Sequence, residues 1–157
     1  MAREDLDAVL AIAAGLKNAP QWDRRAYEGA ILQAQARDRV ALVAEGAQSS
    51  IAGFLVAVLI PPEAELESIA VDAASQRRGI ARQLFAALVQ ELRARCVDIL
   101  LEVRPSNQAG RAFYAALGFV ETARRPAYYA DPVEDAILMR LAIPAKPPDW
   151  LQMPHSS

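Results

Sequence analysis

The sequence predicts one domain of the α/β or α+β class, in which helices flank a mixed central sheet. The chain has 157 residues, of which 54% are hydrophobic, so it can bury a core of its own. Helical and strand-like patterns follow in the order helix, helix, three strands, helix, strand, helix, two strands. A hairpin early in the sheet requires antiparallel strands, whereas the later strand-helix-strand connections favour parallel ones, so the sheet is mixed.

The first half of the chain contains two helices and three strands. Apolar residues at helical spacing predict helices over 6–16 and 24–35, and Asp23 can cap the second. Short apolar runs bounded by turn residues predict strands over 40–44, 51–60 and 66–71. The first two of these strands are joined by a Gly/Gln/Ser turn and should form a hairpin.

The second half alternates between helices and strands. Helical periodicity predicts helices over 80–95 and 107–117, and Gly118 suits the end of the latter. The expected strands are 97–103, 119–124 and 136–143, and the first is apolar enough to be covered on both faces. We expect the domain to span 1–143. Prolines make 144–157 an extended tail, which Trp150, Leu151 and Met153 should dock on the domain or present to a partner.

Composition excludes several classes of protein. The net charge is −2 and the pI about 5.5, so no general basic field favours nucleic acid. The single cysteine, Cys96, suits a reducing cytoplasm, where we expect it to be a packed residue rather than a nucleophile. The single histidine, His155, lies in the tail, so neither a catalytic triad nor a metal site is expected. The longest apolar run, 51–60, is too short for a membrane span.

An arginine-rich segment with one glycine lies between the third strand and the third helix. It comprises Gln76, Arg77, Arg78, Gly79, Ile80 and Ala81, followed by Arg82. The glycine lets a ligand approach the main chain, and the first turn of the helix offers unpaired N–H groups beside the arginine charges. The pattern indicates a phosphate or pyrophosphate site. An ordinary basic helix start with solvated arginines is the alternative.

Two residues in the second half can carry acid–base chemistry. Glu102 interrupts an apolar strand, where loss of solvation raises the pKa of a carboxyl group unless partners compensate. Tyr114 lies on the next helix among apolar neighbours. Each has a structural alternative: Glu102 as a strand-end carboxylate paired with Arg104, and Tyr114 as a core ring with a bonded hydroxyl.

Three segments together resemble the GNAT superfamily of N-acetyltransferases. They read IAVDAASQRRGIARQLF, LLEVRPSNQAGRAFYAALGF and RRPAYYADPVEDAILM, and the resemblance covers roughly 51–143. It implies the GNAT fold, with a mostly antiparallel mixed sheet, and acetyl-CoA as co-substrate without a metal. Within the superfamily the chain is similar to the RimI branch, which acetylates the N-terminal alanine of a small-subunit ribosomal protein.

The resemblance also implies roles for individual residues. Ile69, Ala70 and Val71 would pair with the pantetheine arm, and the main-chain N–H groups from Arg77 to Arg82 would hold the pyrophosphate. Asn107 would contact the cofactor near the acetyl group. Glu102 matches the general base and Tyr114 the general acid. A glutamate can deprotonate an α-ammonium, whose pKa is about 7.7–8.0, and a tyrosine can protonate the departing thiolate.

Several alternatives stay open. Glu67, on the strand before the arginine-rich segment, is a rival base. Tyr128 and Tyr129, expected in a loop before the last strand, can line the acceptor side or simply pack on the surface. The acceptor is a protein N-terminus or, alternatively, a small-molecule amine or lysine, and a catalytically silent acyl-CoA-binding module is the alternative that is not an enzyme. The expected assembly is a monomer or homodimer in the cytoplasm.

Overall fold

The computed structural model describes residues 1–18 and 21–144, and its strands form one six-stranded sheet in the order β1-β2-β3-β4-β6-β5. The strands are β1 (Arg39–Glu45), β2 (Ile51–Ile60), β3 (Glu63–Val71), β4 (Asp98–Val103), β5 (Val120–Ala130) and β6 (Val133–Ala142). Every neighbouring pair is antiparallel except β3 with β4. The expected mixed, mostly antiparallel sheet is therefore confirmed.

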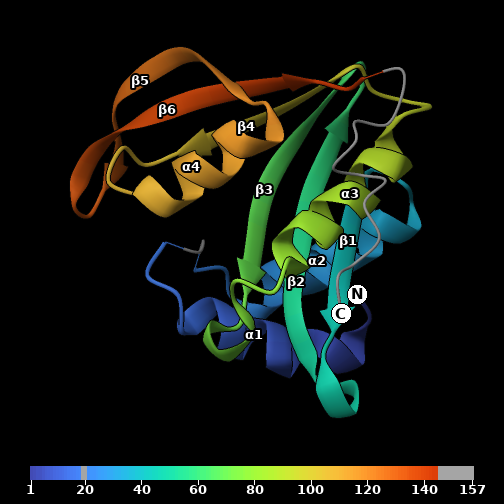
Figure 1. Cartoon of the computed structure of the whole chain (residues 1–157). Helices are drawn as coiled ribbons and strands as arrows, with labels where there is room; N and C mark the ends of the chain where they lie inside the picture. The colour runs from blue at the N-terminus through green and yellow to red at the C-terminus, as the bar shows by residue number, and fades with distance from the viewer. Residues whose placement is uncertain (19–20, 145–157) are drawn as a thin grey trace.

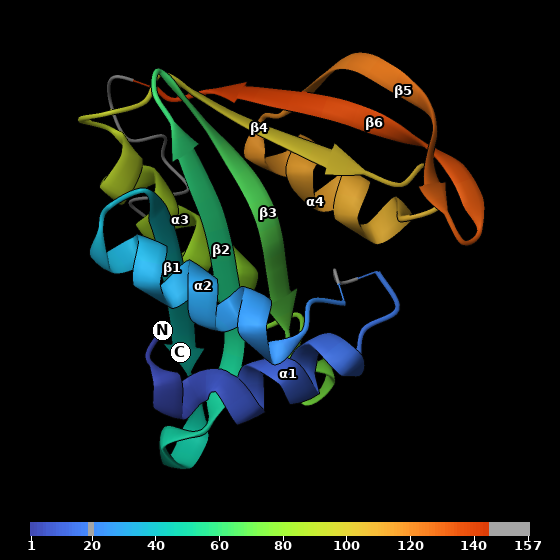
Figure 2. The same ribbon diagram turned by 180° about the vertical axis from the view of Figure 1, so that it is seen from behind.

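Helices cover both faces of this sheet. They are α1 (Leu6–Ala14), α2 (Arg24–Gln35), α3 (Ile80–Leu92) and α4 (Gln108–Leu117), with short 3-10 turns η1 (Arg3–Asp5), η2 (Ala47–Ser49) and η3 (Ala73–Ser75). Figure 2 shows α1 and α2 in front of β1 and β2, and Figure 1 shows α3 on the opposite face. Each side has its own buried core, one around Phe85 and Leu88 of α3 and one around Tyr27 of α2.

Strands β3 and β4 share only a short stretch of pairing. Their register runs from Glu63 opposite Asp98 to Glu65 opposite Leu100 and then stops. Figure 1 shows the two strands starting together and running apart, with β4 continuing towards the β5–β6 hairpin and α4. Beyond Glu65, the main-chain groups of β3 that face β4 therefore have no strand partner. This divergence is the feature of the fold that positions the site.

A bulge in β3 lies at the point of divergence. The pairing with β2 shifts between Val56 opposite Ser68 and Ala57 opposite Leu66, which leaves Glu67 as the extra residue. Leu66 belongs to the core under α3, whereas Ala70 belongs to the core under α1 and α2. The bulge therefore re-aims the side chains of β3 next to the site.

Several element bounds differ from those expected. The last hairpin is longer, since β5 continues to Ala130 and β6 begins at Val133. Tyr128 and Tyr129 therefore lie within a strand, and their expected place in a loop is wrong. Pro126 is tolerated there because β5 is an edge strand whose pairing is irregular between Arg125 and Tyr129. The expected docking of the tail concerns 145–157, which lie outside the described residues.

Candidate active site

The segment between β3 and α3 is held by its own side chains. Asp72 accepts a hydrogen bond from the main-chain N–H of Ala74 at 3.1 Å, and Gln76 donates from Nε2 to the carbonyl of Val71 at 3.2 Å. Arg77 and Gly79 both have positive φ, 60° and 80°. These contacts fold the segment back on the end of β3, so the start of α3 stands beside that strand.

The N-terminus of α3 has the properties of an anion site. Gly79 occupies the N-cap position and no side chain caps the helix there, so the first N–H groups of α3 have no partner from a capping residue. Arg77, Arg78 and Arg82 are all exposed around this turn. A Cβ at Gly79 would meet nothing within 4 Å in this structure, so the requirement for glycine comes from its positive φ.

The free edge of β3 leads directly into this turn. Ile69, Ala70 and Val71 pair with β2 on one side and lie beyond the last pair with β4 on the other. An extended ligand arm with amide groups can therefore add to this edge as a strand would. A pyrophosphate at α3 and an amide-containing arm along β3 fit the same surface, which matches the chemical make-up of coenzyme A.

Glu102 lies on the diverging part of β4 and has partners on β5. Its carboxylate Oε1 is 2.8 Å from Arg125 Nη1. The alternative pairing with Arg104 is wrong, because that guanidinium contacts Glu134 instead, at 3.8 Å. A hydrogen bond to Glu102 is the main cause that raises the pKa of Tyr128. The carboxylate therefore holds two groups from β5.

Tyr114 is partly buried and packs against the core under α3. Its ring lies on α4 against Phe119, with the ring centroids 5.7 Å apart. Desolvation raises the pKa of its hydroxyl to about 12, and Tyr129 adds to the shift. A raised pKa means that the phenol keeps its proton well above neutrality, so Tyr114 is a proton donor at physiological pH.

Two further carboxylates face the same side as Glu102. Burial raises the pKa of Glu67, which Arg39 opposes through an ion pair of 2.8 Å. Burial also raises the pKa of Glu65, and the charge of Glu102 adds to that shift. Glu65 was not expected at the site. The alternation of glutamates at 63, 65 and 67 is the signal that could have found it, because period-two spacing places them on one face of a strand.

Tyr129 lies near both of the expected catalytic residues. Its pKa is raised by burial and by the charge of Glu102, and it acts in turn on Tyr114. The guanidinium of Arg104 lies over its ring, 4.0 Å from the centroid. Tyr129 therefore lies near both Glu102 and Tyr114, and its raised pKa keeps it neutral at pH 7.

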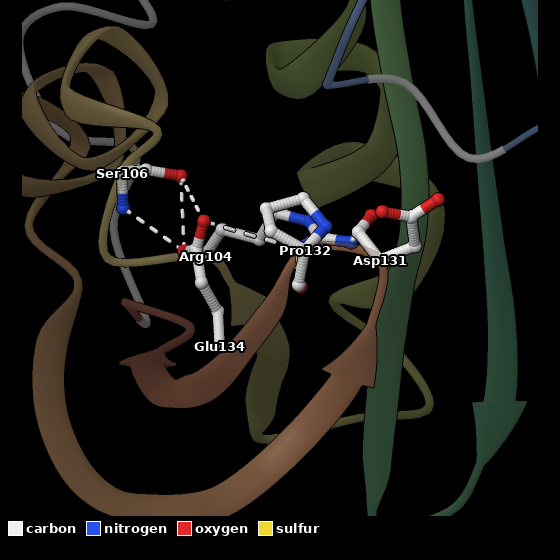
Figure 3. A network of polar contacts seen from close by, with 5 residues as sticks. All are labelled: Arg104, Ser106, Asp131, Pro132 and Glu134. Carbon is white, nitrogen blue, oxygen red and sulfur yellow. Dashed lines mark hydrogen bonds and ion pairs between the residues drawn. The ribbon is translucent and has the colours of Figure 1, made fainter.

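A polar network fixes the turn that follows Tyr129. Arg104 donates to the carbonyl oxygens of Asp131 and Pro132 at 3.2 and 3.0 Å, and Ser106 Oγ donates to the carboxylate of Glu134 at 2.7 Å (Figure 3). The network ties the β5–β6 turn to the segment between β4 and α4. Its members therefore set where the end of β5 stands relative to Glu102.

Asn107 has a structural task at the start of α4. Its Oδ1 accepts a hydrogen bond from the main-chain N–H of Gly110 at 3.0 Å, which makes it the N-cap. The expected contact with the cofactor stays a prediction for this residue.

Among residues 1–18 and 21–144, no group of three metal-binding side chains occurs, and no helix is long and apolar enough to cross a membrane.

Comparison with known proteins identifies the family. Residues 10–119 match the model of the acetyltransferase (GNAT) family. A [ribosomal protein bS18]-alanine N-acetyltransferase from Salmonella typhimurium is 45% identical over 100 residues, which cover 62% of this chain and 68% of that protein. The corresponding protein from Escherichia coli K12 is 46% identical over 96 residues, covering 59% of this chain and 65% of that protein.

A solved structure agrees with this relationship over nearly the whole chain. The crystal structure of the ribosomal-protein-S18-alanine N-acetyltransferase from Escherichia coli superposes with a TM-score of 0.77 and 32% sequence identity, covering 94% of this chain and 93% of that one. The family match of residues 10–119 includes the anion-binding turn, Glu102 and Tyr114 but ends before β5. Arg125, Tyr128 and Tyr129 lie outside it.

Proposed function

Since the chain belongs to the acetyltransferase (GNAT) family and is an acetyl-CoA-dependent N-acetyltransferase, we propose that its acceptor is the α-amino group of a protein N-terminus. The acceptor that we propose is the N-terminal alanine of ribosomal protein S18, which is named for the relatives with 45% and 46% identity. We place this reaction in the cytoplasm, where ribosomal proteins and acetyl-CoA are both present.

The observation that carries the proposal is the position of Glu102 on the diverging part of β4. Beyond Glu65 the edge of β3 is open to a ligand. Glu102 lies two positions after Leu100, the last residue of β4 that pairs with β3. A carboxylate there can take the proton of an ammonium that approaches an acetyl group held along β3. Tyr129 lies near both this carboxylate and Tyr114, which supports Glu102 as the proton acceptor and Tyr114 as the proton donor of one reaction.

The residues divide the reaction into binding, proton removal and proton return. Arg77, Arg78 and the N-terminus of α3 would hold the pyrophosphate, and Ile69 to Val71 would pair with the pantetheine amides. Glu102, directly or through a water molecule, removes a proton from the acceptor ammonium. The amine attacks the thioester carbonyl, whose oxygen is polarised by main-chain N–H groups of β3. Tyr114 returns a proton to the departing thiolate.

Tyr128 and Tyr129 are proposed to hold the main chain of the acceptor peptide. Both lie at the end of β5, with their ring centroids 5.0 Å apart, and Tyr128 is 47% exposed. An exposed phenol next to the base can donate a hydrogen bond to a peptide carbonyl. A small-molecule amine lacks such a carbonyl, so these tyrosines favour a peptide acceptor.

Steady-state kinetics with matched acceptors test the proposed acceptor class. Release of coenzyme A is followed with three substrates: a peptide that begins Ala-Arg, the same peptide blocked at its N-terminus but carrying a lysine, and a small primary amine. We expect a far higher kcat/KM for the free N-terminus. Tyr129→Ala should raise the KM for this peptide without changing acetyl-CoA binding. Equal kcat/KM for all three acceptors would contradict the proposal.

A further inference from the structure

The carboxylate of Glu102 is covered by a residue that reaches it from solvent. The side chain of Glu102 is 18% exposed, whereas that of Arg125, which pairs with it at 2.8 Å, is 53% exposed. Arg125 lies on β5, opposite Ala136 of β6, and Glu102 lies opposite Leu138 on the other edge of β6. The guanidinium therefore bridges over β6 to reach the carboxylate.

The Arg39–Glu67 pair is buried more deeply than the Arg125–Glu102 pair. Arg39 and Glu67 are both mostly buried, with 19% and 17% of their side chains exposed, and Arg39 also lies over the ring of Trp22, 5.8 Å from its centroid. Separating this pair would leave uncompensated buried charges. The half-exposed guanidinium of Arg125 can return to water at little cost, because exposed ion pairs contribute little stability.

Besides Arg125, a second carboxylate and two tyrosines surround Glu102, and two further cations act on these neighbours: Arg39 on Glu65, and Arg104 over the ring of Tyr129. Glu65 approaches from β3, and the two charges disfavour each other. Tyr128 and Tyr129 approach from β5. Since two carboxylates share this space, a positive charge beside them is favourable whether it comes from Arg125 or from a ligand. The acceptor proposed above carries such a charge, because an α-ammonium has a pKa of about 7.7–8.0 and is mostly protonated at pH 7.

We propose that Arg125 is a positioning residue that neutralises Glu102 while the acceptor site is empty, and that the acceptor ammonium displaces it. The inference rests on the proposed function, since it requires a cationic acceptor. The exchange replaces one cation by another, so the net charge around Glu102 and Glu65 stays the same. The displaced guanidinium stays near the ring of Tyr128, whose centroid is 5.0 Å from its Cζ. A neutral group cannot make this exchange, so Arg125 selects for charged acceptors.

Peptide binding to variants at two adjacent arginines tests the inference. Calorimetry at pH 7 with coenzyme A present gives the Kd of an Ala-Arg peptide without turnover. Arg125→Gln should bind the peptide more tightly, by up to about fivefold, the factor that corresponds to an exposed ion pair. Arg125→Lys keeps the charge and should bind like the unmodified protein. Arg124→Gln is the matched control, because Arg124 lies opposite Ile137, on the other face of β5, and pairs with Glu121.

A second peptide separates displacement from a merely structural effect. The same sequence with an acetylated N-terminus is neutral at that end, so its Kd should not improve in Arg125→Gln. Weaker or unchanged binding of the free peptide to Arg125→Gln, or equal gains for both peptides, would overturn the inference. The proposed function is tested separately by the unmodified protein: if it neither binds nor acetylates the free peptide, the acceptor class is wrong whatever the variants do.

Discussion

At the scale of single residues, the group proposed to accept a proton and the group proposed to donate one lie on different elements. Glu102 lies on β4 and pairs with Arg125. Tyr114 lies on α4 and packs against the ring of Phe119, and burial raises the pKa of the Tyr114 hydroxyl to about 12. Tyr114 therefore keeps its proton at neutral pH and has it available to donate, and we propose Glu102 as the group that accepts a proton. Two further carboxylates, Glu65 and Glu67, lie on β3, so mutation must decide which of the three glutamates is the base.

Replacing each glutamate by glutamine identifies the base. We expect Glu102→Gln to lower kcat by about 10²–10⁴, because the amide keeps the volume but cannot accept the proton. The Kd for acetyl-CoA should not change, since Glu102 lies away from the anion-binding turn. Glu65→Gln and Glu67→Gln should keep most of the activity. If Glu67→Gln is inactive while Glu102→Gln turns over, the base lies on β3 instead.

Tyr114→Phe tests the proton donor, and the pH dependence of kcat gives an independent check. We expect kcat to fall by about 10²–10⁴ if this tyrosine is the sole acid. Because the pKa of Tyr114 is raised to about 12, its proton is retained at pH 10, where an ordinary tyrosine is half ionised. The unmodified enzyme should therefore show no loss of kcat with a midpoint near pH 10. Such a loss in the unmodified enzyme, absent from Tyr114→Phe, would contradict this role.

At the scale of elements, two turns hold the site in place. One joins β3 to α3 and carries the proposed anion site, and the other joins β5 to β6 and follows Tyr128 and Tyr129 at the end of β5. Both are fixed by side-chain contacts to a neighbouring strand end, Gln76 with Val71 in the first and Arg104 with Asp131 and Pro132 in the second. The cofactor side and the acceptor side can therefore be perturbed independently.

Substitution of Gly79 tests the first turn. Its φ of 80° is a conformation that costs a residue with a side chain about 1–2 kcal/mol. We expect Gly79→Val to remove most of the rise in Tm that acetyl-CoA causes in the unmodified protein. Gly29→Ala is the control: Gly29 lies inside α2 with nothing within 4 Å of an added Cβ, so it should gain about 0.5–1 kcal/mol of stability and keep the acetyl-CoA effect. A full shift in Gly79→Val would show that the turn does not bind the cofactor.

Substitution of Glu134 tests the second turn. Hydrogen bonds from Ser106 lower the pKa of Glu134, so the ionised carboxylate and its contacts persist at neutral pH and are lost only as pH falls through that lowered value. We expect Glu134→Gln to loosen the turn and raise the KM for the acceptor peptide, with no change in acetyl-CoA affinity. Glu121→Gln, which removes an exposed pair with Arg124 on the same hairpin, should have no effect. Similar KM values in both variants would show that the β5–β6 turn does not position the acceptor peptide.

At the scale of the whole molecule, the order of elements could be predicted from the sequence because it depends on local patterns, and the anion site at the start of α3 stays a prediction from the same kind of pattern. The divergence of β3 from β4 could not be predicted, since it concerns pairing between segments distant in sequence. Glu65 was missed because the expected strand began at 66, and Arg125 because its contact depends on register across an irregular edge strand. The position of Tyr128 and Tyr129 was missed because Pro126 argues locally against a strand.

The central claim is that the chain acetylates a protein α-amino group with Glu102 as the base. Tandem mass spectrometry of one peptide that begins with alanine and also contains an internal lysine tests it most directly, after incubation with acetyl-CoA and either the unmodified enzyme or Glu102→Gln. We expect a single added acetyl group on the N-terminal alanine with the unmodified enzyme and almost none with the variant. Acetylation of the lysine alone, or equal α-amino acetylation by both proteins, would contradict it.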